Sequence, residues 1–559
     1  MKKTKFIFIV GGVISGVGKG IASASIGKIL QGRGFEVTAI KIDPYVNVDA
    51  GTMNPTEHGE VFVLNDGTEC DQDMGNYERF LGRDLSRSNY MTTGSVYWDV
   101  IQKERSLGYK GKCVEVVPQV PLAIIEKIEH ALETAQADVV IVEIGGTVGE
   151  YQNILFLEAV RMLKFKRPDD VLLVLVSLLP ALEAGGTEIK SKPTQYAVRT
   201  LNAAGLQPDI IIGRARIPLD DKRKQTIALN CSLDIKDIIS SPNVDDIYKI
   251  PLEFEKANLS TRILKKLKLR PKQSDLKEWR AMLEQLQDPK KVVKIGIVGK
   301  YFGSGNFVLT DSYISVLEAI RHAATHNKVK PIIEWVDAEE FEKKSKALEN
   351  LKNYHGIIVP GGFGSSGVEG KILAIKYARE HKIPFLGLCY GMQLATIEFA
   401  RHIAGISDAN TTEINAKTKN PVIHIMAEQE KLLEGANYGG TMRLGAYECK
   451  LKPSTKSFEA YANHKLLITN NLISERHRHR YEFNNDYRDL LEKKGLVIAG
   501  TSPNNKLVEI IELKNHPFFV GTQFHPEFKS QPLSPHPLFV EFIKNSIKNS
   551  TPRGALEKY

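Results

Sequence analysis

The sequence predicts an α/β protein with two domains, each built around a parallel sheet. In the N-terminal part, an apolar strand at residues 5–10 leads into a glycine-rich stretch at 11–20. An amphipathic helix at 21–31 and a second strand at 35–42 follow. A strand, a helix and a further strand in this order form a βαβ unit. In the C-terminal part, an apolar run at 383–388 breaks into Gly-x-Cys-x-Gly, and a helical pattern follows.

Length and composition agree with this class and exclude others. Of the 559 residues, 42% are apolar and 25% charged, which is ordinary for a globular protein with more than one core. The five cysteines are widely spaced and form no CxxC pair, so we expect a reducing compartment, the cytoplasm, without structural zinc or disulfides. No run approaches about 20 apolar residues, so we expect no membrane span. The apolar N-terminus imitates a secretory signal, but a strand and a glycine loop explain it better.

The formal charge of +9 raises the question of a nucleic-acid partner. The positive excess is spread thinly, and the one dense cluster, at 476–480, lacks the interleaved aromatic residues of a stacking surface. That cluster is either a solvated loop or a site for an anion or carboxylate. We expect no nucleic-acid partner, because binding of polyanionic nucleotides explains the modest excess equally well.

The glycine-rich stretch at 11–20 has the arrangement that cradles phosphates, since N–H groups at the start of a helix point towards a bound anion. It departs from the strict phosphate-loop pattern, because Val13 stands at the first glycine position and Gly20 replaces the usual hydroxyl residue after the lysine. Magnesium would therefore need other oxygens. Asp73 and Glu143 are the acidic candidates, although either one alone would be an ordinary surface carboxylate.

Further strands at 139–142, 171–176 and 210–212 extend the same sheet. After the strand at 171–176, Lys190 and Lys192 stand at the start of a predicted helix. Lysines there oppose the helix dipole, which makes them unusual as surface decoration and reasonable as ligands of a triphosphate.

A charged, proline-containing stretch separates the domains, with a short helical pattern around 276–286. Strands at 292–298, 357–359 and 385–388 then open a second α/β unit. The predicted organisation is a nucleotide-binding domain at 1–270, a linker at 271–291, a second domain at 292–546 and a flexible tail at 547–559.

Cys389 lies on the sharp turn between the strand at 385–388 and the next helix, which is the geometry of a nucleophile elbow. A helix N-terminus beneath the sulfur favours thiolate and offers a free N–H to an oxyanion. His525 and Glu527, separated by one proline, can share one side of the chain as base and orienting carboxylate. For a lone cysteine, a buried core residue would be the better interpretation.

The motifs of the second half closely resemble those of the type I glutamine amidotransferases. They are Val-Pro-Gly-Gly-Phe-Gly at 359–364, Leu-Cys-Tyr-Gly-Met-Gln at 388–393 and His-Pro-Glu at 525–527. The resemblance implies that Cys389 takes the acyl group of L-glutamine as a thioester and releases ammonia, and that the Pro-Gly-Gly turn completes the oxyanion hole. It also implies that glutamine is recognised by Gly362, Tyr390, Gly391, Met392, Gln393, Glu413 and Arg480.

The first half resembles the amidoligase domain of the CTP synthases, whose sheet is of the dethiobiotin-synthetase type. The matching stretches are 41–49, 51–55, 58–63, 143–149 and 192–195. The resemblance implies ATP as a substrate, Mg²⁺ on Asp73 and Glu143, amination of UTP, inhibition by CTP and a homotetramer. The implied nucleotide residues are Ser15, Gly16, Val17, Gly18, Lys19, Gly20, Ile21, Asp73, Glu150, Tyr151, Gln152, Lys190, Ser191, Lys192, Pro193, Thr194, Gln195 and Thr226.

Several positions depart from that family's pattern. Gln152 stands where an acidic residue is usual, and Thr226 where a lysine contacts the nucleotide, with Lys224 as a possible substitute. Tyr390 replaces a leucine. Ser365 and Ser366 replace an aromatic residue and an arginine in a glycine-rich lid that the family associates with activation by GTP. The family also implies an internal ammonia channel, with Pro55, His58 and Val61 at its constriction.

Two other functions remain open from the sequence. Cobyrinic acid a,c-diamide synthetase joins a similar phosphate loop to a similar amidotransferase but amidates a carboxylate. A partition-type ATPase would use the second half only for interactions. The Lys-Ile-Asp-Pro-Tyr and Lys-Pro-Thr-Gln stretches favour a nucleotide acceptor over the first, and Cys389, His525 and Glu527 favour an enzyme over the second.

Overall fold

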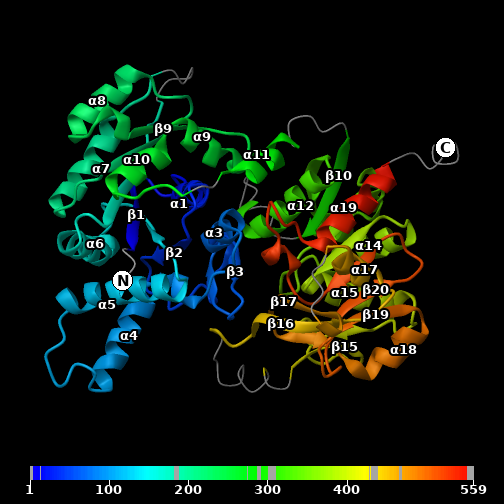
Figure 1. Ribbon diagram of the computed structural model, residues 1–559. Helices are drawn as coiled ribbons and strands as arrows, with labels where there is room; N and C mark the ends of the chain where they lie inside the picture. The colour runs from blue at the N-terminus through cyan, green and yellow to red at the C-terminus, as the bar shows by residue number, and fades with distance from the viewer. Residues whose placement is uncertain are drawn as a thin grey trace. The chain divides into compact units, whose positions relative to one another are not determined.

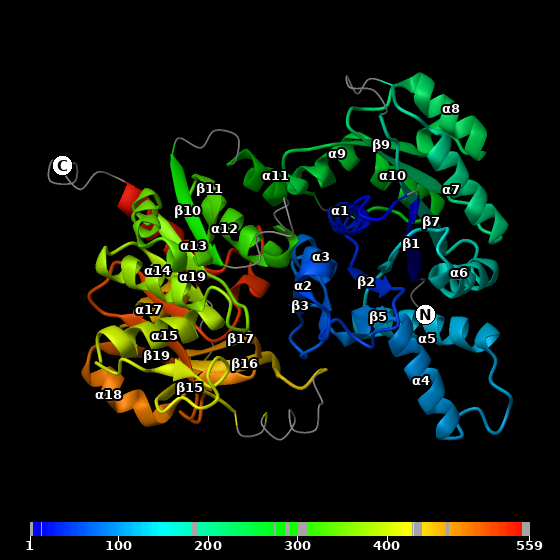
Figure 2. The same cartoon turned by 180° about the vertical axis from the view of Figure 1, so that it is seen from behind.

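The structure is a computed structural model that describes residues 4–12, 14–181, 188–272, 275–285, 291–299, 310–426, 429, 439–464 and 469–550. The chain divides into two compact units, which Figures 1 and 2 show from opposite sides. Unit 1 comprises Met1–Ala50 and Asp73–Leu283, and unit 2 comprises Gly51–Gln72 and Glu284–Tyr559. Among the described residues, no helix has both the length and the apolar character needed to cross a membrane.

Unit 1 is built on a seven-stranded sheet in the order β5-β2-β6-β1-β7-β8-β9, and each neighbouring pair is parallel. The parallel sheet predicted from the sequence is confirmed. The strands are β1 (Lys5–Gly12), β2 (Val37–Asp43), β5 (Tyr90–Thr92), β6 (Val139–Ile144), β7 (Val171–Leu178), β8 (Ile210–Ala215) and β9 (Ile238–Pro242).

Helices cover both faces of this sheet. On one face, Phe6, Phe8 and Val10 of β1 share a core with apolar side chains of the helices α5 to α8. On the other face lies α1, where a Cβ built on Gly27 would lie 3.3 Å from Ile141. The helices are α1 (Lys19–Gln31), α3 (Asp73–Leu81), α4 (Thr93–Arg105), α5 (Val116–Thr134), α6 (Ile154–Lys166), α7 (Lys192–Ala203), α8 (Asp221–Cys231), α9 (Ile250–Lys256), α10 (Leu259–Lys266) and α11 (Lys277–Glu284).

Unit 2 contains a nine-stranded mixed sheet in the order β11-β10-β12-β13-β21-β20-β19-β16-β17. Its first five strands are parallel and the rest are antiparallel. The sequence predicted three of the parallel strands, β10, β12 and β13, and none of the antiparallel ones. The strands are β10 (Val292–Gly299), β11 (Lys330–Asp337), β12 (Gly356–Val359), β13 (Phe385–Leu388), β16 (Arg443–Leu451), β17 (Leu472–His479), β19 (Leu496–Thr501), β20 (Val508–Leu513) and β21 (Phe519–Thr522).

Two apolar cores lie on opposite faces of this sheet, one with helices α14 and α15 and one with α12 and α19. A small sheet of β14 (Asn410–Thr411), β15 (Pro421–Ile425) and β18 (Tyr481–Phe483) completes the unit. The helices are α12 (Ile314–His326), α13 (Ala338–Lys343), α14 (Val368–Glu380), α15 (Tyr390–His402), α17 (Lys456–Asn463), α18 (Arg488–Lys493) and α19 (Pro537–Ser550).

The segment 51–72 belongs to unit 2, whereas the sequence analysis placed it in a first domain of residues 1–270. It forms the short helix α2 (Pro55–His58) and a hairpin of β3 (Val61–Val63) and β4 (Glu69–Asp71). Phe62 packs edge-on against Phe528 with ring centroids 5.0 Å apart, and Arg478 forms a 2.8 Å ion pair with Glu69. Apolar packing and a buried ion pair thus hold the segment in unit 2.

The predicted linker at 271–291 and tail at 547–559 also have different limits in the structure. Helix α11 lies within the predicted linker, but its Trp279 is buried against Phe80 and Tyr248 and donates to the Tyr248 carbonyl over 2.8 Å. That part of the linker is therefore core of unit 1. Helix α19 continues to Ser550, four residues into the predicted tail. Residues 286–290 and 551–559 lie outside the described residues.

Candidate functional site

Cys389 lies on the turn between β13 and α15, as the sequence predicts. Its φ of 49° and ψ of −98° are strained for a non-glycine residue, which is typical of a nucleophile elbow. The neighbouring glycines make the turn possible, because a Cβ on Gly391 would lie 2.1 Å from the Val359 carbonyl oxygen. The Cys389 N–H donates to the Thr522 carbonyl over 2.7 Å, which anchors the turn to β21.

His525 and Glu527 face each other directly after β21. The distance from His525 Nδ1 to Glu527 Oε1 is 2.7 Å, and the imidazole stacks on Phe528 with centroids 4.9 Å apart. Burial favours the neutral imidazole, but the charges of Glu527 and Cys389 outweigh burial and raise the pKa of His525 to about 10. The arrangement therefore favours an imidazolium at His525.

These three side chains line one cavity of about 90 Å³ in unit 2. The cavity wall also includes the Gly361–Gly362 turn, where a Cβ on Gly361 would lie 2.8 Å from His525 Cε1. Glycine is therefore required for the turn to approach the imidazole. The complete lining is Pro55, Glu60, Val61, Ser312, Tyr313, Gly361, Gly362, Phe363, Cys389, Arg478, His525, Glu527 and Phe528.

The two residues expected to bind the charged groups of glutamine lie near Tyr481. Burial raises the pKa of Tyr481, Glu413 raises it further and Arg480 opposes this, so both charges act on the same phenol. Glu413 accepts from the Gly364 N–H over 2.7 Å, and Arg480 donates to Gln429 Oε1 over 2.6 Å. The side chains of the other expected residues, Tyr390, Met392 and Gln393, are buried at the start of α15.

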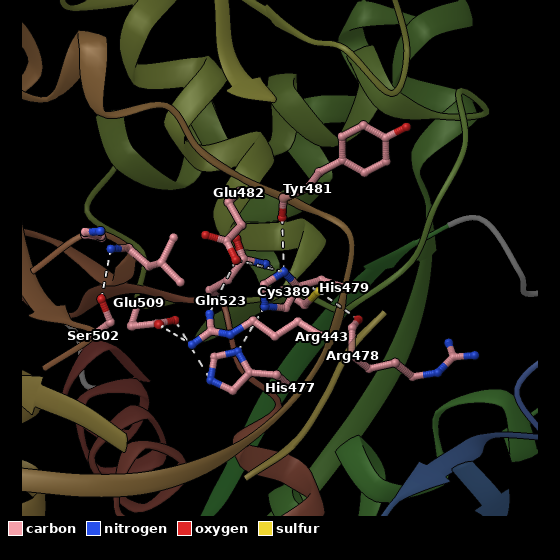
Figure 3. Close-up of polar contacts among 12 residues, drawn as sticks. Cys389, Arg443, His477, Arg478, His479, Tyr481, Glu482, Ser502, Glu509 and Gln523 are labelled. Carbon is pink, nitrogen blue, oxygen red and sulfur yellow. Dashed lines mark hydrogen bonds and ion pairs between the residues drawn. The ribbon is translucent and has the colours of Figure 1, made fainter. Parts of the chain in front are cut away.

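A polar network behind Cys389 was not predicted (Figure 3). Gln523 Nε2 donates to Cys389 Sγ over 3.7 Å, and the Arg478 carbonyl lies 3.8 Å from the same sulfur. Farther back, Arg443 lies between Glu482 at 3.4 Å and Glu509 at 2.8 Å. A signal was present, because Gln523 lies two residues before His525 and basic residues alternate along the strand that contains Arg478.

The basic cluster at 476–480 is not a solvated loop, so that interpretation was wrong. Residues up to 479 belong to β17, and Arg476 and His477 are fully buried. His477 Nδ1 lies 2.9 Å from His479 Nε2, and burial, followed by the charge of Arg443, lowers the pKa of both rings well below the usual value. They therefore pack as neutral rings. Arg478 is the member of the cluster that lines the cavity, and Arg480 lies just beyond the strand.

The buried pair of carboxylates in this network makes stability depend on pH. Burial raises the pKa of Glu482 to about 7, with Arg443 opposing the shift and Glu509 adding to it. Between about pH 4.5 and pH 7, the native state keeps the proton on Glu482 and the unfolded state has released it. The free energy of unfolding therefore falls as the pH rises through this range. We expect Glu482→Gln to stabilise the protein on the order of 2 kcal/mol at pH 8 and not at pH 4.5, measured by denaturant unfolding.

Glu448→Gln is the matched control, because Glu448 is exposed on β16, the strand that contains Arg443. It should leave the free energy of unfolding unchanged at both pH values. Equal destabilisation by Glu482→Gln at pH 4.5 and pH 8 would contradict the assigned protonation.

In unit 1, the glycine-rich stretch lies between β1 and α1. Gly16 and Gly18 have φ values of 69° and 87°, and α1 begins at Lys19, so backbone N–H groups surround the helix start. Lys19 is buried and donates from Nζ to the Gly146 carbonyl over 2.7 Å. Burial lowers the pKa of Lys19 despite the opposing charge of Glu143. Ser15 is exposed, Val17 is buried and Ile21 is half-buried on the first turn.

Gly20 is explained by Asp73. A Cβ on Gly20 would lie 2.0 Å from Asp73 Oδ1, so this carboxylate occupies the space of the hydroxyl side chain that usually follows the lysine. Lys41 joins the two acidic residues, with a short ion pair to Asp73 and a 3.2 Å pair to Glu143. Burial would raise the pKa of Asp73, but Lys41 holds it below the usual value, whereas burial raises that of Glu143. Two inward carboxylates suit Mg²⁺, which takes its remaining ligands from water and phosphates.

The remaining nucleotide candidates follow β6, β7 and β8 along the chain, and the carboxyl ends of these strands form the edge where parallel sheets bind ligands. Glu150 accepts from the Thr147 N–H over 2.8 Å and from Gln152 Nε2 over 2.6 Å, and Tyr151 is 93% exposed. Thr194 is fully buried and bonded to Ser177 over 2.8 Å. Lys190, Ser191, Lys192 and Pro193 remain at least partly accessible, and Gln195 is 5% exposed. Thr226 is exposed on α8 and donates to the Lys222 carbonyl.

Two family models match the chain. One, described as CTP synthase N-terminus, matches residues 5–269, and one described as Glutamine amidotransferase class-I matches residues 308–545. A CTP synthase of Carboxydothermus hydrogenoformans is 50% identical over 98% of this chain and 99% of its own length. One of Sulfolobus acidocaldarius is 48% identical over 97% and 99%. The glutaminase domain of a Trypanosoma brucei CTPS, solved with bound acivicin, is 36% identical and covers 46% of this chain and 96% of its own, with a TM-score of 0.41.

Proposed function

This chain belongs to the CTP synthase family, and from that premise we propose which residues perform each step of the reaction. Enzymes of this family use ATP and glutamine to aminate UTP to CTP, and the chain is a ligase of that class (EC 6.3.4.2). The carboxylate-amidating and partition-ATPase functions are therefore excluded as primary activities. The observation that carries the assignment of residues is the Cys389 elbow beside the His525–Glu527 pair.

In the glutaminase half, the Cys389 thiolate attacks the side-chain carbonyl of glutamine. The resulting oxyanion is stabilised by the N–H groups of Gly362, in the glycine turn that lines the same cavity as Cys389, and of Tyr390, at the start of α15. His525 protonates the departing ammonia, Glu527 holds the imidazole in position, and water then hydrolyses the thioester. Glu413 and Arg480 bind the ammonium and carboxylate groups of the substrate.

In the synthetase half, the N–H groups of residues 16–21 bind the phosphates of ATP. Lys19 and Lys41 neutralise the charge that develops as the γ-phosphoryl group moves to O4 of UTP. Asp73 and Glu143 would hold Mg²⁺, which supplies further neutralisation of the phosphate oxygens. UTP, or CTP as inhibitor, binds near Ser15, Glu150–Gln152 and Lys190–Gln195. Ammonia then displaces the phosphate at C4.

Ammonia leaves the glutaminase cavity along the segment 51–72. Pro55 and Val61 line the cavity that contains Cys389, and the Pro55 carbonyl accepts from Ser312 Oγ over 3.1 Å. These contacts lie within unit 2 and support the channel entrance that the family resemblance implies. A route through protein keeps ammonia from becoming ammonium in bulk water.

The assembly and its regulation belong to the same proposal. Apolar side chains of α4, α5 and their connection are exposed, which suits contact with a second copy of the chain and supports a homotetramer. They are Trp98, Ile101, Leu107, Val116, Val117 and Leu122. GTP is the proposed activator. In the segment where the family has an arginine, this chain has Ser366, which donates to Glu339 Oε1 over 2.7 Å. All five cysteines are free thiols, which suits the cytoplasm.

The test is the absorbance change from UTP to CTP with ATP and Mg²⁺, with glutamine or ammonium chloride as nitrogen source. We expect CTP from both sources, and a higher rate with glutamine when GTP is added. If glutamine is hydrolysed but neither source gives CTP, the residues assigned to UTP, among them Gln152 and Thr226, serve another acceptor. If GTP left the glutamine-dependent rate unchanged, only the proposed activation by GTP would be contradicted.

A further inference from the structure

Tyr390 follows the nucleophile directly, and its side chain reaches the glycine segment that contributes Gly361 and Gly362 to the cavity lining. Its hydroxyl donates to the Gly364 carbonyl over 2.8 Å, and the residue is 1% exposed. The ring lies beside Gly362, where a built Cβ would be 3.8 Å from Tyr390 Cδ1. The same residue therefore contributes its backbone to the nucleophile elbow and its side chain to the facing turn.

Gly364 is held through both of its peptide groups. Its carbonyl accepts from Tyr390 and its N–H donates to Glu413 Oε1 over 2.7 Å. It has a φ of 76°, in the region that favours glycine, so the chain turns sharply between these two bonds. The turn lies between the end of β12 at Val359 and the start of α14 at Val368, outside either element. Side-chain hydrogen bonds therefore fix a stretch that no sheet or helix ladder fixes.

The phenol ring is itself held in place. The Lys371 ammonium, on the buried side of α14, lies 5.4 Å from the ring centroid, and Lys371 is only 4% exposed. A buried cation over an aromatic face favours one orientation of that ring. This orientation directs the hydroxyl of Tyr390 towards Gly364.

We propose that Tyr390 is a positioning residue for the glutaminase reaction, which fixes the Gly362 N–H relative to its own N–H and so keeps the oxyanion site formed before substrate binds. This inference rests on the proposed function, because it assigns the two N–H groups to the oxyanion. Preorganised donors stabilise a developing charge without reorganisation, so a displacement of one donor lowers the rate of the chemical step. Packing alone would not require the hydroxyl, since phenylalanine would fill the same space.

The test is Tyr390→Phe in the full-length protein. We expect kcat for glutamine hydrolysis to fall by roughly tenfold, because one donor is loosened rather than removed, with KM for glutamine within about twofold. CTP formation from ammonium chloride should be unchanged. Alkylation of Cys389 by iodoacetamide should also keep its rate, because alkylation forms no oxyanion and reports only on the thiolate.

Tyr354→Phe is the matched control. The Tyr354 hydroxyl donates to Glu334 over 3.0 Å in the same unit, outside the cavity, and the variant loses a comparable hydrogen bond. It should keep full glutaminase activity. The inference is overturned if kcat of Tyr390→Phe equals that of the wild type, if Cys389 alkylation slows in parallel with kcat, or if the control loses as much activity. Failure of the proposed function would appear separately, as a wild type that forms no CTP from glutamine.

Discussion

Replacing Cys389 with alanine abolishes CTP formation from glutamine, with a loss of at least ~10³-fold, and leaves formation from ammonium chloride within about twofold. The sulfur is the only atom in the proposed chemistry that forms a bond to glutamine, so water and the remaining groups give little hydrolysis. The synthetase residues lie in unit 1, and ammonia from solution reaches them without the thioester step. Initial rates of CTP formation with each nitrogen source measure the two activities in one assay.

Cys449→Ala is the control for loss of a buried thiol. Cys449 is fully buried in unit 2, and burial raises the pKa of its thiol well above the usual value, so it is no nucleophile. Its removal deletes a small apolar group and should affect stability more than the glutamine-dependent rate. If Cys389→Ala lost both activities, the account with two separate sites would be wrong. If it lost neither, Cys389 would not be the nucleophile.

The sequence predicted the elbow and the triad well because the signals are local. A strand, a glycine turn and a helix occupy consecutive residues around Cys389, and Pro526 restricts the backbone of His525, which precedes it. Likewise, strand-length apolar runs predicted β1, β6 and β7, since strands buried on both faces are continuously apolar. The antiparallel half of the second sheet was missed. Its strands β17 and β20 contain charged residues among the apolar ones, so neither is a continuous apolar run.

The packing partners of the segment 51–72 could not be predicted. Its assignment to unit 2 depends on pairs distant in the chain, such as Glu60, which accepts from the Ser315 N–H over 3.2 Å at the start of α12. A carboxylate is favourable at a helix N-terminus, but nothing local in the sequence says which helix it serves. The burial of Arg476 has the same cause, since its partner Asn65 lies in this segment.

The departure at Gly20 shows how structure can explain what a sequence pattern leaves open. From the sequence, the absent hydroxyl only implied that magnesium needs other ligands. In the structure, the carboxylate of Asp73 fills the space above Gly20, so glycine is required there, and Asp73 is the oxygen donor that we propose in place of the hydroxyl. The two features form one arrangement although 53 positions separate them along the chain.

Glu143→Gln is expected to reduce CTP formation from glutamine and from ammonium chloride alike, by on the order of 10³-fold. The amide keeps the shape of the side chain but removes one of the two charges proposed to hold Mg²⁺. Lys41 would then lose its partner Glu143 but keep its ion pair with Asp73, so its charge would oppose the cation at the remaining ligand. UTP-dependent ATP turnover should fall with CTP formation, and raising the Mg²⁺ concentration should restore part of it. Alkylation of Cys389 should keep its rate.

Tyr77→Phe is the control that separates loss of the Glu143 carboxylate from a disturbance of the hydrogen bonds around it. The Tyr77 hydroxyl donates to Glu143 Oε2 in a short hydrogen bond, and burial, with the charge of Glu143, raises the pKa of the phenol. Phenylalanine removes this bond and keeps the carboxylate, so we expect a loss within about tenfold and an unchanged magnesium dependence. If Tyr77→Phe were as inactive as Glu143→Gln, the buried hydrogen-bond network would matter more than the charge. If Glu143→Gln kept its activity at low Mg²⁺, Asp73 and the phosphates would suffice for the metal.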